Sequence, residues 1–151
     1  MEYRNILCPV DDTGVSEEAE RHAAYLSKLS GGRVTLLHVV EKWYRSQPVV
    51  TNSDEWEHIH DDWLKQGRDF LQHEAEKVKG YGAVHIDTAL RDGDAAHEIV
   101  ATAFETKADL IVMATHRYSP IGKIFAGSVT DRVTRKSPCP ILWVLASKPI
   151  E

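Results

Sequence analysis

The chain has 151 residues, of which 42% are hydrophobic and 27% are charged, which is typical of one folded domain over residues 1–151. Its net charge of −5 argues against a nucleic acid or an anionic membrane as a partner, because both bind basic surfaces. No apolar run is long enough to span a membrane, and Cys8 and Cys139 lie in apolar runs that favour buried free thiols, so we predict a cytoplasmic protein.

The first part of the chain predicts two strands with a helix between them. Residues 5–10, NILCPV, form an apolar run that stops at the turn formers of DDTG. The helical pattern of residues 16–30 follows, with Ser16 expected as its N-cap and Gly31-Gly32 expected to end it. Residues 33–40, RVTLLHVV, then predict the second strand.

A long helix and a further series of strands and helices complete the chain. We expect helices at 54–79, 95–107 and 128–136, and strands at 83–90, 109–114 and 140–146. This alternation favours an α/β protein with an open five-stranded parallel sheet and helices on both faces.

The composition of the strands predicts their places in the sheet. Residues 5–10 and 109–114 are continuously apolar, as central strands covered on both faces should be. Residues 83–90 alternate between apolar and polar side chains, which is typical of an edge strand. The last strand is apolar and is expected at the other edge, where it needs a cover. A homodimer through Ile141–Leu145 would supply this cover, and the protein's own helices are the alternative.

The histidine-rich segment WEHIHDDW offers candidate metal ligands within the long helix. His58 and Asp62 share a helix face and His60 points elsewhere, so a solvated face is favoured over a metal site. Trp56 and Trp63, seven residues apart, fit an apolar stripe on the same helix.

Two candidate binding segments follow strands that carry continuous apolar runs. Open parallel sheets bind ligands beyond the carboxyl ends of their strands. The segment Pro9-Val10-Asp11-Asp12 follows the first strand, and a long loop follows residues 109–114. Asp11 is a candidate acceptor for a ribose hydroxyl, and an Asx-type cap on the following turn is the alternative.

The end of the long loop is suited to an anion. Ser128 and Asp131 form a pair like a capping box, which predicts that a helix begins at Ser128. Gly127 lets the backbone approach a ligand, and the amides of Gly127, Ser128 and Val129 would then point at a phosphate. An ordinary helix cap would have the same residues.

These segments together resemble the universal stress protein family over nearly the whole chain. The blocks ILCPVDDT, VTLLHVV, ADLIVMATH, AGSVTDRV and SPCPILWV are similar to family blocks in the same order. ATP-binding members carry G-x2-G-x9-G-[ST] after the fourth strand. Here Ala114 and Arg117 stand at the first two glycines, and Gly127-Ser128 keeps the end of the motif at the same spacing.

The resemblance implies a fold, a ligand and a set of site residues. The implied sheet has the order 3-2-1-4-5, as in Rossmann-like adenine nucleotide alpha hydrolases, and dimerises through its last strand. The implied ligand is ATP or AMP, with Mg²⁺ or Mn²⁺ as a candidate companion. By this resemblance, adenine and ribose border Pro9, Val10 and Asp11, adenine meets Val39 and Met113, and ribose and phosphates contact Ala114, Thr115, His116, Arg117, Gly127, Ser128 and Val129.

Arg117 leaves two functions open. Its guanidinium is a planar group with several hydrogen-bond donors, which suits a phosphate. Its side chain is also bulky where glycine is expected, so it would fill the space of the phosphates. The first alternative gives a homodimeric nucleotide-binding stress protein, and the second gives a nucleotide-free dimer that acts through protein contacts. The chain lacks the phosphate-loop, dinucleotide and nucleophile-elbow motifs of common enzymes, so we assign no catalytic residue and expect at most slow ATP hydrolysis.

Overall fold

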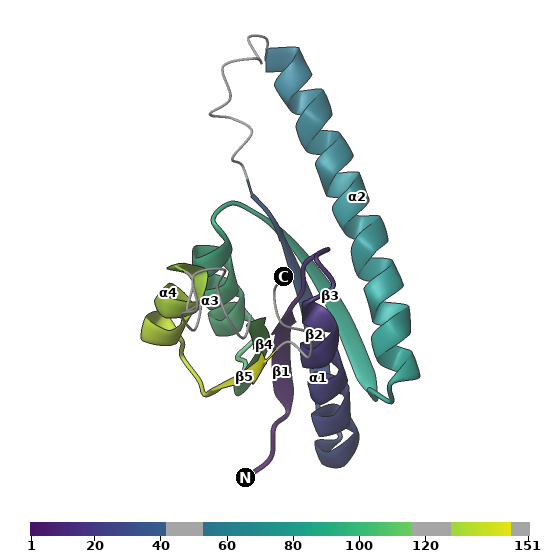
Figure 1. The fold of residues 1–151 in the computed structure, drawn as a ribbon, viewed down its shortest axis with the longest axis vertical. Helices are drawn as coiled ribbons and strands as arrows, with labels where there is room; N and C mark the ends of the chain where they lie inside the picture. The colour runs from purple at the N-terminus through teal and green to yellow at the C-terminus, as the bar shows by residue number, and fades with distance from the viewer. Residues whose placement is uncertain (42–52, 116–127, 146–151) are drawn as a thin grey trace.

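The computed structural model describes residues 1–41, 53–115 and 128–145, which alternate between strands and helices (Figure 1). The strands are β1 (Asn5–Pro9), β2 (Arg33–Val40), β3 (His85–Asp92), β4 (Leu110–Thr115) and β5 (Ile141–Leu145). The helices are α1 (Ser16–Ser30), α2 (Ser53–Gly80), α3 (Ala95–Glu105) and α4 (Ser128–Lys136). The strands pair in parallel in the order β3-β2-β1-β4-β5. This confirms the predicted fold class and strand order.

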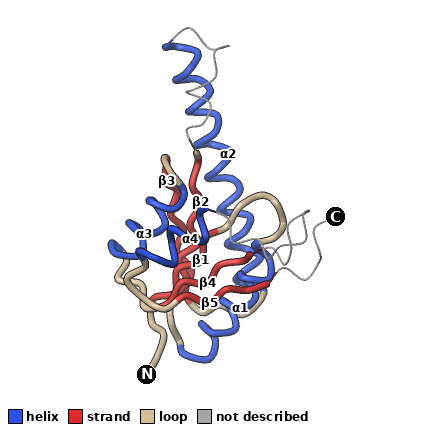
Figure 2. Tube along the Cα trace, turned by 60° about the vertical axis from the view of Figure 1, so that its left-hand side comes forward, coloured by secondary structure: helices blue, strands red, loops and turns tan. Residues whose placement is uncertain are grey.

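Helices cover both faces of the sheet (Figure 2). Successive residues of a strand point to opposite faces, so an apolar strand needs a cover on each side. Ile6 and Cys8 of β1 pack in a core cluster with residues of α1 and α2. Leu7, which lies between them, packs with residues of α3 and α4 in a second cluster. The strands β1 and β4 are buried on both faces, as predicted, and this explains their continuous apolar runs.

The third strand lies two residues further along the chain than predicted. Val84 is not part of it, because its amide donates to the Ser27 hydroxyl of α1 at 3.1 Å. The strand instead includes Arg91 and Asp92, which lie beside Val39 and Val40 of β2. Its position at the edge of the sheet is as predicted.

Ser16 does not cap α1, which corrects the expectation from the sequence. The N-cap position is Val15, which makes no side-chain capping bond. The Ser16 hydroxyl instead accepts a hydrogen bond from the amide of Asp11 at 2.9 Å, so it ties the helix to the end of β1. The predicted end of the helix is confirmed, since Gly31 has the left-handed backbone of a helix C-cap.

The last strand leaves apolar side chains open at the edge of the sheet. Leu142 is 36% exposed and Leu145 is 50% exposed. Within the described residues, the helices of the chain cover Trp143 and Val144 at least in part and leave Leu142 and Leu145 exposed. Cys139, just before this strand, is half-buried rather than buried, whereas Cys8 is fully buried.

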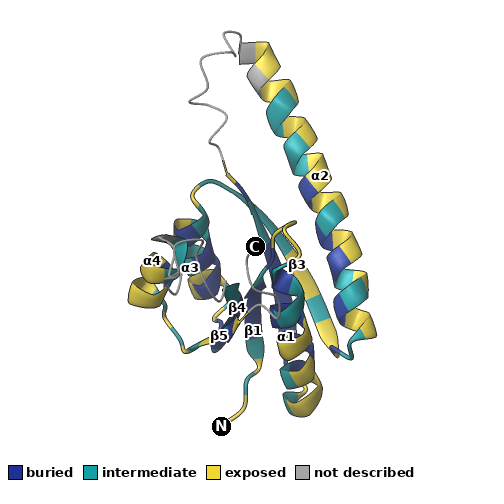
Figure 3. Cartoon of the chain, viewed as in Figure 1, coloured by how far each residue is buried: buried dark blue, intermediate teal, exposed yellow. Residues whose placement is uncertain are grey.

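Helix α2 extends well past the sheet (Figures 1 and 3). Its C-terminal half packs through Leu71 and Val78, while His58 and Asp62 in the N-terminal half are exposed. His60 is half-buried and contacts the Asp92 carboxylate at the end of β3, so the predicted solvated face does not include it. Where α2 crosses β3, a Cβ on Gly67 would lie 2.8 Å from a Leu90 methyl group, so glycine allows the close crossing. None of the helices in the described part of the chain is long and apolar enough to cross a membrane.

A pair of acidic side chains is buried between α1 and α2. Glu20 of α1 is fully buried and Glu74 of α2 is nearly so. Lys77 lies beside them, with its ammonium nitrogen 3.2 Å from Glu74 Oε2 and 3.8 Å from Glu20 Oε2. One lysine, itself 33% exposed, thus faces two buried carboxyl groups.

Candidate functional site

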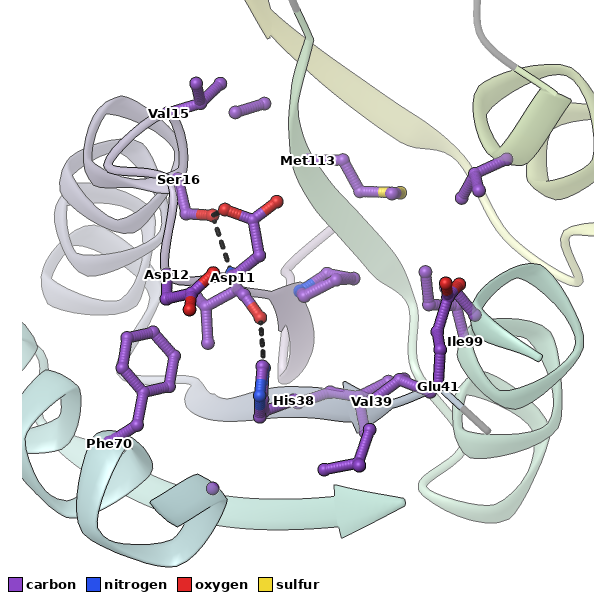
Figure 4. A pocket seen from close by; sticks show the side chains of 18 of the residues that line it. Asp11, Asp12, Val15, Ser16, His38, Val39, Glu41, Phe70, Ile99 and Met113 are labelled. Carbon is purple, nitrogen blue, oxygen red and sulfur yellow. Dashed lines mark hydrogen bonds between the residues drawn. The ribbon is translucent and has the colours of Figure 1, made fainter. Parts of the chain in front are cut away.

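A cavity of about 930 Å³ lies at the carboxyl ends of β1, β2 and β4 (Figure 4). It forms there because β1 and β4 are neighbours from which the chain leaves toward opposite faces of the sheet, which is where open α/β sheets bind ligands. The predicted site residues that line it are Pro9, Val10, Asp11, Val39, Met113, Ala114, Thr115 and Val129. The fold thus brings together residues that are up to 120 positions apart in the sequence (Pro9 and Val129, 129 − 9).

The other predicted site residues are not placed in the cavity by the described structure. His116, Arg117 and Gly127 lie outside the described residues. Ser128 is the first residue of α4, as predicted. Val129 and Thr130, in the first turn of this helix, line the cavity, so the N-terminus of α4 lies at this wall.

Asp11 forms the Asx-type turn that was the alternative to a ribose contact. Its Oδ1 accepts hydrogen bonds from the Thr13 amide at 3.0 Å and from the Thr13 hydroxyl at 2.5 Å. The Ser16 hydroxyl lies 3.4 Å from the same oxygen (Figure 4). These bonds hold the carboxyl group at the edge of the cavity, where its role as a ribose ligand stays a prediction.

His38 links the ends of β1 and β2 at the floor of the cavity. Its Nδ1 lies 3.0 Å from the Val10 carbonyl oxygen (Figure 4). A carbonyl only accepts hydrogen bonds, so Nδ1 carries a proton and donates it to this oxygen. The ring packs on Phe70 of α2 with centroids 4.9 Å apart, which fixes its orientation.

Helix α2 supplies a wall that the sequence did not predict. Trp63, Gln66, Gly67 and Phe70 line the cavity from the middle of this helix. Trp63 was expected only as part of an apolar stripe. The spacing of Trp63, Gly67 and Phe70, at i, i+4 and i+7, is the signal that they share one helix face.

Apolar and polar groups are separated within the cavity. Val39, Ile99 and Met113 present apolar side chains to it, and Asp11, Asp12 and Glu41 present carboxyl groups (Figure 4). An apolar slot suits a planar ring, while carboxylates accept hydrogen bonds from hydroxyl or amino groups. Helix N-termini attract anions. The cavity therefore has the chemistry to hold a molecule with a ring, hydroxyl groups and an anionic end.

Both cysteines are unsuited to act as nucleophiles. Burial raises the pKa of Cys8, and the nearby carboxylates of Glu20 and Glu74 raise it further. Burial also raises the pKa of Cys139. Both thiols therefore stay protonated at neutral pH, and the protonated form is the unreactive one.

Relatives of this chain extend over almost its whole length. A universal stress protein of Methanocaldococcus jannaschii is 34% identical over 148 residues, which cover 97% of this chain and 84% of the relative. Universal stress protein YxiE of Bacillus subtilis is 30% identical, with 94% of this chain and 99% of the relative covered.

Solved structures share the fold. Universal stress protein UspA of Lactobacillus plantarum superposes with a TM-score of 0.80 at 23% identity, covering 95% of this chain and 99% of its own. An Archaeoglobus fulgidus universal stress protein in complex with dAMP has a TM-score of 0.69 at 23% identity, covering 95% and 98%. A universal stress protein in complex with cAMP has a TM-score of 0.70 at 19% identity, covering 97% and 100%. The profile of the universal stress protein family matches residues 2–144. This chain belongs to the universal stress protein family.

Proposed function

We propose that this protein binds an adenine nucleotide, ATP or AMP, in the cavity at the carboxyl ends of β1, β2 and β4. It acts as a homodimer in the cytoplasmic response to stress, and it senses or buffers the nucleotide without strong catalysis. The observation that carries the proposal is the cavity itself, which gathers predicted site residues from the ends of β1, β2 and β4 and from the start of α4 around one space. The dAMP and cAMP complexes of two structural neighbours support adenine nucleotides as the ligand class.

The proposed pose follows from the chemistry of the walls. Adenine lies on the apolar side chains of Val39 and Met113, with the ribose near Asp11. The phosphates extend toward the start of α4, where the amides and the helix dipole favour negative charge. Mg²⁺ or Mn²⁺ would bind the phosphates, and Asp11 and Asp12 have the carboxylate oxygens that both ions prefer.

Bound nucleotide is the first test of this function. We expect adenine nucleotide in the supernatant when the purified protein is denatured, or binding of ATP or AMP with a Kd in the millimolar range or tighter when the stripped protein is titrated. Trp63 lines the cavity, so tryptophan fluorescence should change during the titration. A protein that releases no nucleotide and binds none would contradict the proposal and favour the nucleotide-free dimer.

Exchange of Arg117 for glycine distinguishes the two roles of this side chain. If Arg117 is a phosphate ligand, Arg117→Gly weakens ATP binding by about tenfold and reduces its salt dependence, because one charged hydrogen-bonding group is lost. If the side chain fills the phosphate space, the same substitution strengthens binding. We expect weaker binding, measured by calorimetric titration at two salt concentrations.

The homodimer through β5 is tested by a charge at its exposed edge. Leu142→Lys places an ammonium group in the proposed interface, so we expect a monomer by light scattering at micromolar concentration, where the unchanged protein is a dimer. Phe104→Lys is the matched control, because Phe104 is 62% exposed and lies on α3 rather than on the edge strand. A monomeric unchanged protein, or a dimer that tolerates Leu142→Lys, would count against this interface.

A further inference from the structure

We infer that Asp94 and Arg132 are positioning residues, whose ion pair holds the N-terminus of α3 against the second turn of α4 at the phosphate end of the proposed nucleotide site. The inference rests on the proposed function, which places phosphates at the start of α4. It adds a reason why that helix start has a fixed position.

The pair has the geometry of a rigid clamp. Arg132 donates from Nη1 to Asp94 Oδ1 at 2.9 Å and from Nη2 to Asp94 Oδ2 at 2.7 Å. Two parallel hydrogen bonds between planar groups fix orientation as well as distance. Asp94 is itself immobilised, because it is the N-cap of α3 and its Oδ2 accepts a hydrogen bond from the His97 amide at 2.9 Å.

Both clamped helices line the cavity with residues next to the pair. Ala95 follows Asp94 directly, and Ile99 lies one turn later on α3. Val129 and Thr130 of α4 line the cavity in the turn before Arg132. α3 and α4 lie side by side (Figure 1). A change in the separation of these helices would therefore move the wall that carries the amides of α4.

The contribution of this ion pair to folding stability is too small to explain why the pair is present. Both side chains are about half exposed, at 45% for Arg132 and 50% for Asp94, and exposed ion pairs add little to folding. The Arg132 guanidinium, together with the His97 amide, holds the pKa of Asp94 below its ordinary value, so Asp94 is ionised at neutral pH. An unpaired carboxylate beside this wall would repel a phosphate. The ion pair with Arg132 offsets this negative charge.

Asp94→Asn distinguishes a positioning role from a purely electrostatic role, because the two roles predict opposite changes in ATP affinity. Asparagine keeps the N-cap of α3, so the helix stays formed, but it loses the charged clamp. If charge alone mattered, removal of a carboxylate would tighten ATP binding. We expect ATP binding to weaken by about fivefold to tenfold, as phosphate hydrogen bonds lose their alignment. Adenosine, which has no phosphate, should bind with unchanged affinity.

Arg135→Gln is the matched control. Arg135 lies on the same helix and pairs with Asp131 of that helix, so its loss removes one positive charge from α4 without touching α3. We expect a change in ATP affinity of less than about twofold. Arg132→Gln should weaken ATP binding as much as Asp94→Asn, and the double variant should be no worse than either single variant.

Hydrogen exchange of residues 128–136 tests the clamp without any nucleotide. We expect faster amide exchange in Asp94→Asn than in the unchanged protein or in Arg135→Gln. Unchanged exchange, or ATP binding as tight as in the unchanged protein, overturns the inference while the proposed function stands. If the unchanged protein binds no nucleotide, the proposed function and the phosphate role fall together, and exchange alone decides whether the pair holds α4.

Discussion

Glu20→Gln is expected to stabilise this protein by about 3 kcal/mol at pH 7. Burial, followed by the effect of the neighbouring Glu74 side chain, raises the pKa of Glu20 to about 9 from an ordinary value of 4.5. Between these two pH values the folded state holds a proton that the unfolded state releases. Folding therefore becomes less favourable by about 1.4 kcal/mol for each pH unit in this range.

The sign of the effect sets its pH profile. The stabilisation from protonated Glu20 is complete below pH 4.5 and is lost as pH rises through about 9. Glutamine is neutral without taking up a proton, so the variant and the unchanged protein should have equal stability near pH 4.5 and diverge above it. Urea denaturation at several pH values measures this difference.

Glu17→Gln is the control for Glu20→Gln. Glu17 lies on the same helix with its side chain 44% exposed, and hydrogen bonding to Arg21 lowers its pKa. Its loss should therefore remove a small stabilisation that is present at neutral pH and absent in acid, which is the opposite trend. A Glu20→Gln variant whose stability follows that of the unchanged protein from pH 4.5 to 9 would show that Glu20 is ionised in the folded state.

Gly32→Ala is expected to destabilise the protein by about 3 kcal/mol. A Cβ at this position would lie 2.2 Å from the Tyr3 carbonyl oxygen and 3.1 Å from the Arg4 Cα, and both are backbone atoms that cannot rotate away. The turn is also fixed from the helix side, since the Ser27 hydroxyl donates to the Gly32 carbonyl at 2.6 Å. The methyl group must therefore separate the start of β2 from the chain that leads into β1.

Gly80→Ala is the matched control for this clash. Gly80 ends α2, and a Cβ there would meet no atom within 4 Å. Its stability should stay within about 0.5 kcal/mol of the unchanged protein, because alanine is a good helix former. Thermal or urea unfolding compares the two variants. A Gly32→Ala protein as stable as Gly80→Ala would mean that the backbone at this turn relaxes freely.

The sequence predicted the sheet well because the pattern of apolar and polar side chains in each strand reflects how far that strand is buried. The central strands β1 and β4 are apolar except for one polar residue at an end of each, and the edge strand β3 alternates. The errors arose where a side chain or an amide serves another element. Val84 bonds to α1 instead of continuing the strand, and Ser16 bonds to Asp11 instead of capping its own helix. Such bonds between elements leave no periodic signal.

The candidate site was predictable where it is built from strand ends. The residues after β1 and β4 follow from the topology of a parallel sheet. The wall formed by Trp63 and Phe70 depends on where α2 crosses the sheet, which is set by tertiary packing at Gly67. Glu20 was missed although its position between Ser16 and Ala24 places it on the buried face of α1. An acidic residue near a helix start is usually interpreted as solvated.

The cavity is lined by residues from every element of the described chain except β3 and β5. A molecule held there is retained only while all of those elements are in place, so unfolding of any one of them releases it. Its binding free energy therefore adds to the stability of the whole domain. At a free concentration 100 times the Kd, the gain is about 2.7 kcal/mol. The lifetime of this protein in the cell would then depend on the size of the nucleotide pool.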